Sequence, residues 1–432
     1  MSASVPLRMR RAPGPHPERD HAARIRTAAE AIAVASALAE QIATGAAERD
    51  RTRTLPTAQV AAVAASGLTA ITVPVADGGP GLPASTAAEV FRILGAADPN
   101  VAQIIHSHML YTQVLVLAGT AEQRETLLGG VVDGMLMANA QSERSGATAK
   151  EIATTLTATA SGLELSGAKY YCTGSMFADV IPVLARLDDP TSPWHGEEMI
   201  AYVDRSTEGL AVVDDWNGMG QRTTASGTVT LDRVAVRPEL VVRRAALFER
   251  PQVYGALAQL LHTAIDVGIA RGALDEAARF VRTSSRPWFE AQVATAAEDP
   301  LVIQRFGELY VQVAGAESAL AAAGSAVDRA ASAAARAGLG RELTSARDVE
   351  EAVGAASLAV AVAKVLGETA AVGVSSALFE VSGTRSAGAD GALDRYWRNA
   401  RTHTLHDPVR WKYQHLGAYA LTGALPPRHS AI

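Results

Sequence analysis

The spacing of apolar residues along the 432-residue chain changes twice. Between about residues 21 and 134, apolar side chains recur every three or four positions, which is typical of helices with one buried face. Between about residues 137 and 242 the period shortens to two, which predicts β-strands. After Pro251 the helical period returns. This order predicts an α+β fold that is mainly α-helical.

Individual elements follow from these patterns. Alternating residues on both sides of the Ser161-Gly162 turn predict a β-hairpin. Strands are predicted at 155–159, 163–167, 180–186, 199–204, 210–214 and 227–236. Long, weakly charged helices are predicted at 253–283, 300–337 and 346–381. Apolar helices of this length suit an antiparallel bundle that also buries a subunit interface.

The changes of period divide the chain into four segments. Residues 21–136 are predicted to form an N-terminal helical domain, residues 137–243 a middle β-barrel or sandwich domain, and residues 244–432 a C-terminal helical bundle with an active-site tail. Residues 1–20 carry arginines and prolines but no apolar segment, so they predict a disordered tail rather than a signal peptide.

The composition narrows the classes of partner. Hydrophobic residues make up 48% of the chain, charged residues 19%, and the net charge is -6, so we expect neither a nucleic acid nor an anionic membrane as partner. The most apolar stretch, 352–379, is interrupted by Lys364 and Glu368 and falls short of the roughly 20 apolar residues that span a bilayer. The single cysteine, Cys172, excludes an intrachain disulfide and fits a reducing cytoplasm.

The densest group of chemically active side chains is 398–408, with His403, His406 and Asp407. Because Pro408 restricts the residue before it, one helix is expected to end just before this point, and Asp407 is expected to cap a second helix that Pro408 begins. Imidazoles at such a junction can exchange protons near neutral pH. Capping or core roles for these side chains remain open. A metal site of His-x-x-His plus Asp is a third interpretation, but no further ligand is identifiable.

Two other groups carry weaker signals. In the segment 169–175, the Thr173 hydroxyl and the backbone N–H groups of Gly174 and Ser175 could face a planar ligand, although such residues also form ordinary turns. Trp216 either forms the wall of an aromatic pocket or fills the edge of the β-domain.

Basic residues and two further histidines complete the candidates. Arg282 and Arg286 could bind a phosphate group as a fork, or could be exposed cations at a helix end. His106 and His108 lie in an apolar helical stretch, where a buried structural histidine is the default.

Taken in order, these pieces resemble the acyl-CoA dehydrogenase superfamily over about residues 22–425. The segment 218–222, Gly-Met-Gly-Gln-Arg, and the strand 229–236 that follows are similar to the family's "MGxR" strand pair. Tyr171-Cys172-Thr173 is similar to its Trp-Ile-Thr/Ser strand, which contacts flavin. The resemblance implies the acyl-CoA dehydrogenase fold with a C-terminal four-helix bundle, and a Thr173 hydroxyl near flavin N5.

Within the superfamily, Asn139, Thr173, Trp216 and above all 398–408 resemble the two-component monooxygenases of the dibenzothiophene and sulfur-acquisition branch. This resemblance implies that a separate flavin reductase supplies reduced FMN, that O2 forms a C4a-hydroperoxyflavin, and that one oxygen atom passes to a hydrophobic small molecule. An organosulfur or heteroaromatic compound is the foremost expectation. A cytoplasmic homotetramer is also implied.

The resemblance assigns roles to single residues. The two histidines of the His-Thr-Leu-His run would lie beside the flavin, so His406 is expected to hydrogen-bond or protonate the peroxide, with His403 and Asn139 assisting. Thr173 would hold the N5 region. Of the two helical histidines, His108 is the preferred further pocket residue.

Two departures from the family pattern matter. Asp407-Pro408 stands where a dehydrogenase has its catalytic Glu followed by Gly. The segment 379–385 lacks the glutamine and one glycine of the run that contacts FAD, so FMN is preferred to FAD, with Arg385 as a phosphate ligand beside Arg282 and Arg286. The rivals are an FAD-dependent acyl-CoA dehydrogenase with Asp407 as base, and a non-catalytic flavin-binding homologue.

Overall fold

The computed structural model describes residues 24–144, 151–338, 345–429 and 431–432. The predicted tail, residues 1–20, lies outside the described residues.

The N-terminal region is helical, as the three-to-four-residue period predicts. A capping box at Thr27, whose hydroxyl accepts from the Glu30 N–H, starts the first helix. The helices are α1 (Ala28–Ala43), α2 (Ala46–Thr52), α3 (Thr57–Ala65), α4 (Ala84–Ala97), α5 (Pro99–Ala118), α6 (Ala121–Gln123) and α7 (Gly129–Val132).

The period-two region forms one seven-stranded sheet in the order β5-β6-β2-β1-β3-β4-β7. Its strands are β1 (Thr155–Thr159), β2 (Gly162–Lys169), β3 (Val180–Asp188), β4 (Glu198–Asp204), β5 (Leu210–Val213), β6 (Thr228–Val236) and β7 (Val241–Arg243). The predicted hairpin is confirmed, because β1 and β2 pair antiparallel with Leu156 opposite Leu165. Only β1 and β3 run parallel among the paired strands of the described chain.

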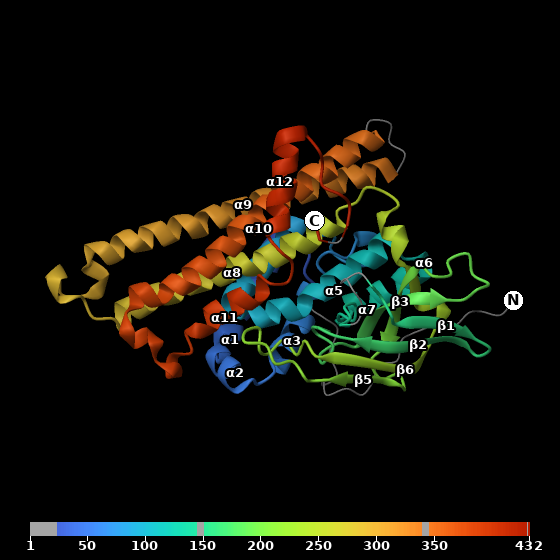
Figure 1. The fold of residues 1–432 in the computed structure, drawn as a ribbon, viewed down its shortest axis with the longest axis horizontal. Helices are drawn as coiled ribbons and strands as arrows, with labels where there is room; N and C mark the ends of the chain where they lie inside the picture. Colours follow the sequence, from blue (N-terminus) through green and yellow to red (C-terminus); the bar gives the residue numbers. More distant parts are fainter. Residues whose placement is uncertain (1–23, 145–150, 339–344, 430) are drawn as a thin grey trace.

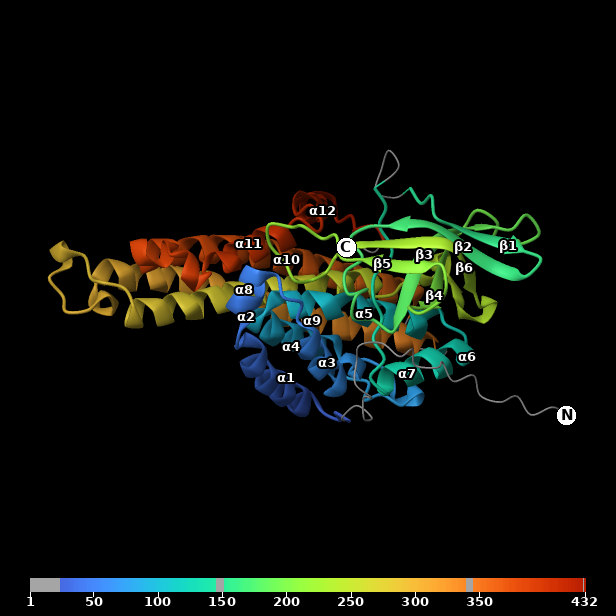
Figure 2. The ribbon, with the colours of Figure 1, turned by 90° about the horizontal axis from the view of Figure 1, so that it is seen from below.

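The three predicted long helices are also confirmed. They are α8 (Tyr254–Thr283), α9 (Pro300–Gly338) and α10 (Ala346–Ser382), and they are followed by α11 (Asp394–His403) and α12 (Arg410–Thr422). Figure 1 shows the sheet at one end of the molecule and the long helices running away from it. In Figure 2 the N-terminal helices lie along one face of these long helices.

A single hydrophobic core joins the two helical regions. Phe91 of α4 and Ile105 of α5 belong to the same buried cluster as Leu261 of α8 and Ala370 of α10. The many alanines let these helices approach closely. Helices α5 and α10 are long and apolar enough to cross a membrane, but about two-thirds of each apolar window is buried inside the protein (67% and 61%), as in core helices.

The junction after α11 differs from the sequence prediction. Helix α12 begins at Arg410 with Val409 at its cap position and no side-chain cap, so the prediction that Asp407 caps a helix begun by Pro408 is wrong. The Asp407 carboxylate instead forms an ion pair with Lys412 at 2.7 Å. A full cation offers the carboxylate a stronger partner than the partial charge of helix N–H groups.

Glycine 220 lets the β5–β6 connection contact α11. A Cβ at this position would lie 1.9 Å from the Arg398 carbonyl oxygen. We therefore expect Gly220→Ala to lower the free energy of unfolding by about 1–3 kcal/mol, since one of the two segments must move. Urea unfolding measures the effect.

The matched control is Gly307→Ala on the exposed side of α9, where a Cβ would meet nothing within 4 Å. Alanine there should raise the stability by up to about 1 kcal/mol. A Gly220→Ala protein as stable as the native chain would contradict the close packing of this connection against α11.

Candidate active site

Four histidines from three helices and one turn lie together, three of them buried and the fourth, His406, half exposed. They are His106 of α5, His262 of α8, His403 at the end of α11 and His406 in the turn that follows. The rings of His106 and His262 stack with centroids 3.7 Å apart, and the ring of His406 lies 3.9 Å from that of His262 on a tilt of 40°. His262 Nδ1 lies 3.2 Å from His403 Nε2. The sequence prediction had joined only His403 and His406.

The His403 ring is held by a buried carboxylate. Its Nδ1 lies 2.5 Å from Asp266 Oδ1, and neither side chain has meaningful access to solvent. Asp266 stands one helical turn after His262 on α8, so one face of α8 supplies both contacts. The other nitrogen of His403 also lies 3.2 Å from the Gln103 carboxamide.

Burial keeps the inner rings uncharged. It lowers the pKa of His106 to about 3, and it lowers the pKa of His262 and of His403 below their ordinary value. For His403 the attraction of Asp266 opposes this effect without reversing it. The three inner rings are therefore neutral imidazoles at neutral pH, and each can donate a hydrogen bond through one nitrogen and accept one through the other.

A buried ammonium group stabilises the carboxylate. Lys364 of α10 lies 3.2 Å from Asp266, 3.2 Å from Glu368 and 3.8 Å from Asp407, and its side chain is fully buried. Burial alone would raise the pKa of Asp266, but His403 and Lys364 together lower it. The same carboxylates keep the pKa of Lys364 above its ordinary value despite burial. Asp266 and Lys364 are thus an ionised pair inside the protein.

Asp407 is poorly suited to proton abstraction. Although its burial would raise its pKa, His406, Lys364 and Lys412 together hold the pKa well below the ordinary range. A carboxylate stabilised in this way is a weak base.

His108 does not join the cluster. Its Nδ1 accepts the Met137 N–H at 3.0 Å, and its Nε2 lies 3.0 Å from the Thr69 carbonyl oxygen. Both ring nitrogens are therefore committed to the backbone, and the ring fastens α5 to the start of the β-domain. The expectation that His108 rather than His106 reaches the pocket is corrected: His106 is the residue in contact with the other rings. Periodicity cannot separate the two, because both face the interior.

The predicted group around Thr173 lies beside α5. Asn139 donates its backbone N–H to the Thr173 carbonyl at 3.1 Å, and the Ser175 hydroxyl donates to the Asn139 carbonyl at 3.2 Å. A Cβ on Gly174, whose φ is +87°, would lie 2.9 Å from the Ile104 carbonyl oxygen. Only a glycine allows this approach, which brings the end of β2 within one helical turn of His106.

The Thr173 hydroxyl is the first of three hydroxyl groups that are linked by hydrogen bonds. It lies 2.7 Å from the Ser226 hydroxyl, which lies 2.7 Å from that of Thr224, and Thr224 donates to the Gln221 carbonyl at 2.9 Å. Trp216 also donates its indole N–H to that carbonyl at 2.8 Å. These hydrogen bonds therefore link the loop between β5 and β6 to Thr173, the predicted flavin contact.

This loop holds polar atoms without partners. Among the described residues, both atoms of the buried Gln221 carboxamide and the Thr223 and Thr402 hydroxyls make no hydrogen bond. The Gln221 N–H donates to the Asn399 side-chain oxygen at 2.7 Å, and Asn399 lies one turn before His403 on α11. Buried polar groups are nearly always satisfied, and a carboxamide needs a partner with both a donor and an acceptor. The position fits a polar heterocyclic ligand.

The three predicted phosphate-binding arginines lie elsewhere. Arg282, Arg286 and Arg385 are exposed, and Arg385 donates to the Ser284 carbonyl at 2.9 Å just past the end of α8. Arg282 lies about 30 Å further along α8 than His262. Within one chain, the structure does not bring the arginines to the histidines.

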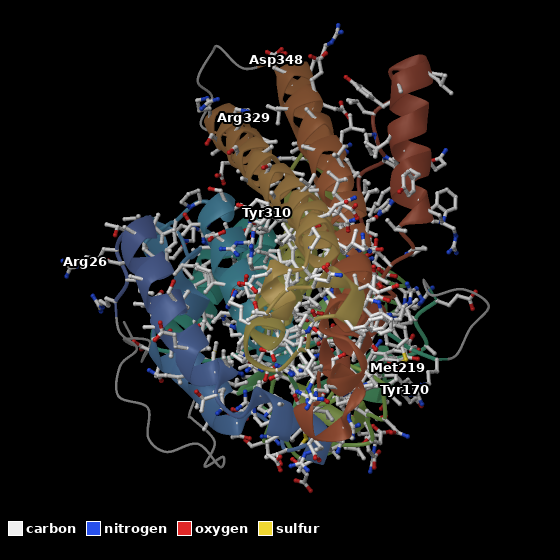
Figure 3. All side chains as sticks on the ribbon, turned by 90° about the vertical axis from the view of Figure 1, so that its left-hand side faces the viewer. Arg26, Tyr170, Met219, Tyr310, Arg329 and Asp348 are labelled. Atoms are coloured by element: carbon white, nitrogen blue, oxygen red, sulfur yellow. The ribbon has the colours of Figure 1, made fainter. Side chains whose placement is uncertain are left out.

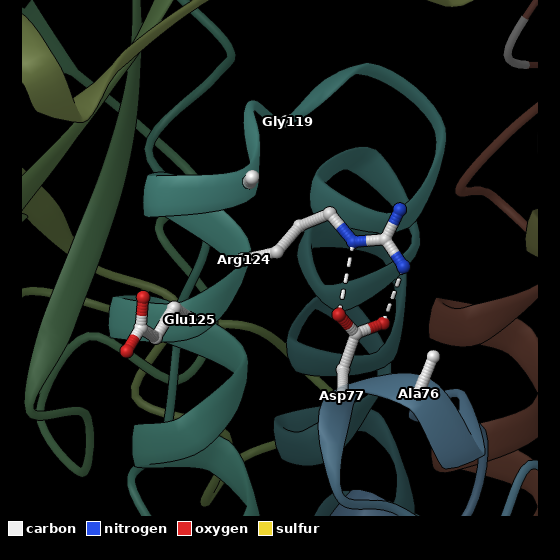
Figure 4. Close-up of a pocket in the computed structure, with 6 residues that line it drawn as sticks. Ala76, Asp77, Gly119, Arg124 and Glu125 are labelled. Atoms are coloured by element: carbon white, nitrogen blue, oxygen red, sulfur yellow. Dashed lines mark hydrogen bonds and ion pairs between the residues drawn. The ribbon is translucent and has the colours of Figure 1, made fainter.

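A separate cavity of about 510 Å³ opens between the turn at Val75–Asp77 and the π-helical turn Arg124–Leu128 (Figure 4). Two of its three charged residues are paired with each other, because Arg124 forms two hydrogen bonds with Asp77; the third is Glu125. It contains none of the predicted site residues.

Sequence reasoning missed His262, Asp266, Lys364 and Gln103. A signal existed: His262 and Asp266 are one helical turn apart within the buried part of α8, and Lys364 and Glu368 are one turn apart within that of α10. Polar pairs on the buried face of a helix need partners on another element. The sequence does not say which elements meet.

Comparisons with known proteins agree with this architecture. Residues 28–135, 138–234 and 260–411 match the N-terminal, middle and C-terminal domains of acyl-CoA dehydrogenase. Dibenzothiophene monooxygenase from Rhodococcus qingshengii is 34% identical over 420 residues, which are 95% of this chain and 98% of that protein. The probable FMNH2-dependent monooxygenase SfnC from Pseudomonas putida is 30% identical over 92% of this chain and 96% of its own length. The crystal structure of FMN-bound TdsC from Paenibacillus sp. A11-2 is 30% identical, with a TM-score of 0.84 over 93% of this chain and 100% of that chain.

The buried carboxyl group of Glu368 predicts a pH dependence of stability. Burial raises the pKa of Glu368 to about 7 against the opposing effect of Lys364, whereas the unfolded chain has a value near 4.5. Between these values the folded state holds a proton that the unfolded state has lost, so stability falls as the pH rises through about 7. We expect Glu368→Gln to remove about 2–3 kcal/mol of the stability lost between about pH 5 and pH 8.

Urea unfolding at both pH values measures this difference. The control is Glu380→Gln at the exposed end of α10, which should leave the pH trend unchanged. Parallel pH trends for the native chain and Glu368→Gln would show that Glu368 is ionised throughout.

Proposed function

The chain belongs to the acyl-CoA dehydrogenase family, and from this premise we propose that it is a monooxygenase that uses reduced FMN and O2 to oxygenate an organosulfur or heteroaromatic compound. The observation that carries the proposal is the four-histidine cluster at the end of α11, next to an Asp407 that is held by two lysines. A cluster of imidazoles can hold and transfer protons, whereas a dehydrogenase of this family needs a free carboxylate base.

The residues present fit FMN. The Gln221 carboxamide offers a donor and an acceptor to the edge of the flavin ring, which alternates the same two groups. Thr173, the backbone N–H of Gly174 and the ring of Trp216 would hold its other edges. The Ser175 N–H, the other predicted contact, already donates to the Cys172 carbonyl at 3.2 Å. When bound, reduced FMN supplies the two electrons that activate O2.

The chain's own residues then manage protons and water. The His406 side chain is half exposed, at 50%, and is the ring best placed to face the reactants. His106 and His403 support it from the buried side. Asn139 lies near Tyr171 and Tyr111, to which its side chain is hydrogen-bonded. The buried rings keep solvent from the reaction, which protects an activated oxygen species from being lost as peroxide.

In the overall reaction, one atom of O2 enters the product and the other forms water. Reduced FMN and O2 give one oxygen atom to the sulfur or ring atom of the substrate, and the other leaves as water with two protons. Tyr171, Met219 and Trp216 provide apolar surface at the edge of the site, and the first two are half exposed. That surface favours a hydrophobic substrate.

A flavin reductase is the proposed partner, since reduced FMN must be supplied.

We also propose a homotetramer in the cytoplasm. Tyr310 lies on the outward side of α9 (Figure 3), and the exposed apolar residues of this helix suit an interface between subunits. An assembly would also explain why the arginines lie far from the histidines of their own chain, because Arg282 of one chain could then reach the FMN phosphate of another.

His406→Ala tests the proton-donor role. We expect product formation to fall about 100-fold, with the consumed O2 appearing as hydrogen peroxide. The measurement uses reduced FMN, O2 and dibenzothiophene, with the sulfur oxide and peroxide both quantified. The control is His195→Ala in the β3–β4 connection, which should keep native activity.

Unchanged product yield in His406→Ala would contradict the catalytic role and favour a non-catalytic flavin-binding protein. A native chain that makes no oxide but reduces bound flavin with an acyl-CoA would instead support the dehydrogenase alternative with Asp407 as base.

Co-expression of two inactive variants tests the shared site. Arg282→Ala and His406→Ala should each be nearly inactive, while mixed assemblies should recover about one quarter of native activity, the statistical share of sites that draw both intact residues from different chains. The control pairs His406→Ala with Asn139→Ala, which belong to the same site and should recover nothing. No recovery in the first mixture would place Arg282 outside the neighbouring site.

A further inference from the structure

His262 has the most ring contacts of the described histidines, yet the proposed function gives it no role. Its ring stacks on His106 at 3.7 Å, tilts against His406 at 3.9 Å, and its Nδ1 lies 3.2 Å from His403. We propose that His262 is a positioning residue, which holds the His406 ring in the orientation needed for proton donation. The inference rests on the proposed function for the meaning of that orientation.

The first step is that His406 has two side-chain neighbours that can orient it, the His262 ring in direct contact and the more distant Asp407 carboxylate. It follows α11 in a turn, where its N–H donates to the His403 carbonyl at 3.0 Å, and half of its side chain is exposed. The Asp407 carboxylate is 3.8 Å from its Nδ1 and is already paired with Lys412 at 2.7 Å. The face of the His262 ring is therefore the main rigid surface against which His406 can rest.

The second step is that His262 is itself fixed. Asp266 is ionised and can only accept, so the proton of the neutral His403 ring must be on Nδ1, and His403 Nε2 must accept. His262 then donates its Nδ1–H to His403 Nε2. The Gln103 carboxamide oxygen is placed 3.2 Å from the same nitrogen, and this tautomer requires the carboxamide to be flipped, so that its –NH2 faces Nε2. Each hydrogen bond thus sets the direction of the next one. Lys364 keeps Asp266 charged, Asp266 places the His403 proton on Nδ1, and His403 Nε2 then accepts from His262.

The third step is that the orientation does not depend on a bound ligand. Asp266, His403 and His262 are all buried, and each partner comes from a different element or a different turn of α8. A ring held by such neighbours keeps one rotamer. His406 can consequently be oriented before reduced FMN or substrate enters.

Crystal structures of the apoprotein test the orientation directly. His262→Phe keeps an aromatic face, and we expect His406 to keep its single rotamer. His262→Ala and His262→Asn lack the ring, and His406 should occupy several rotamers. An ordered, unmoved His406 in a folded variant without the ring would overturn the proposal. The Asn variant provides the test if the Ala variant does not fold.

Kinetics provide the second readout. His262→Ala or His262→Asn should lower kcat about 10- to 100-fold, with the KM for dibenzothiophene and the affinity for FMN within about two-fold of the native values. His262→Phe should recover part of kcat, because it keeps the ring face against His406 but loses the Nδ1–H that is donated to His403. Equal losses in the Phe and Asn variants would overturn the proposal, since they would assign the effect to a nitrogen rather than to the ring.

A buried control separates positioning from stability. Val267→Ala, on the same helix and equally buried, should lower the unfolding temperature without lowering kcat. A fall in kcat with Val267→Ala as large as that with His262→Ala would reduce the role of His262 to packing. If the chain proved inactive towards sulfur compounds, the crystallographic result would still decide whether His262 orients His406.

Discussion

The ammonium group of Lys364 lies between α8 and α10 with no access to solvent, where the ionised Asp266 and Asp407 neutralise it and the carboxyl group of Glu368 lies 3.2 Å away. An unpaired charge at such a depth would cost several kcal/mol, and removing one partner of a buried pair typically costs about 3–5 kcal/mol. The three carboxyl groups come from α8, α10 and the turn after α11. Neutralising one cation therefore fixes how these elements meet.

The histidines depend on that arrangement. Asp266 keeps its charge because Lys364 is beside it, and a charged Asp266 determines which nitrogen of His403 carries the proton. His403 in turn positions His262, and His262 contacts the rings of His106 and His406. A hydrophobic pair in place of Lys364 and Asp266 could pack as well, but it could not set the tautomer of an imidazole. The buried charges are thus explained better by the site than by stability.

The turn after α11, which contains Asp407, explains why this chain differs from a dehydrogenase. In a family whose dehydrogenases use a carboxylate from this segment, Asp407 is followed by a proline and is paired with Lys412 and Lys364. Its pKa is far below the ordinary range, so it has little tendency to take a proton. Beside it lie four imidazole rings, three of which are kept uncharged by burial.

The pattern of apolar residues alone determined the elements of the fold. The strands at 155–159 and 199–204 and the helices at 253–283 and 346–381 were predicted to within a residue or two, because burial on one face imposes a period that the sequence records directly. The domain boundaries stay a prediction. Motifs in 398–408 and 171–173 also indicated the family, since short runs of chemically specific residues survive when the rest of a sequence changes.

The site required the tertiary structure. Gln103, His262, His403 and Lys364 are separated by up to about 300 positions and come from four helices, and no local pattern records which helices touch. The choice between His106 and His108 shows the same limit: both are buried on α5, and only the partners supplied by α8 and the β-domain distinguish them. The role of Asp407 was misjudged for the same reason, because its cap position is local whereas Lys364 and Lys412 reach it only in the folded chain. Periodicity and motifs are local properties of a chain, while the charge and proton arrangement of a buried site is set by contacts between distant elements.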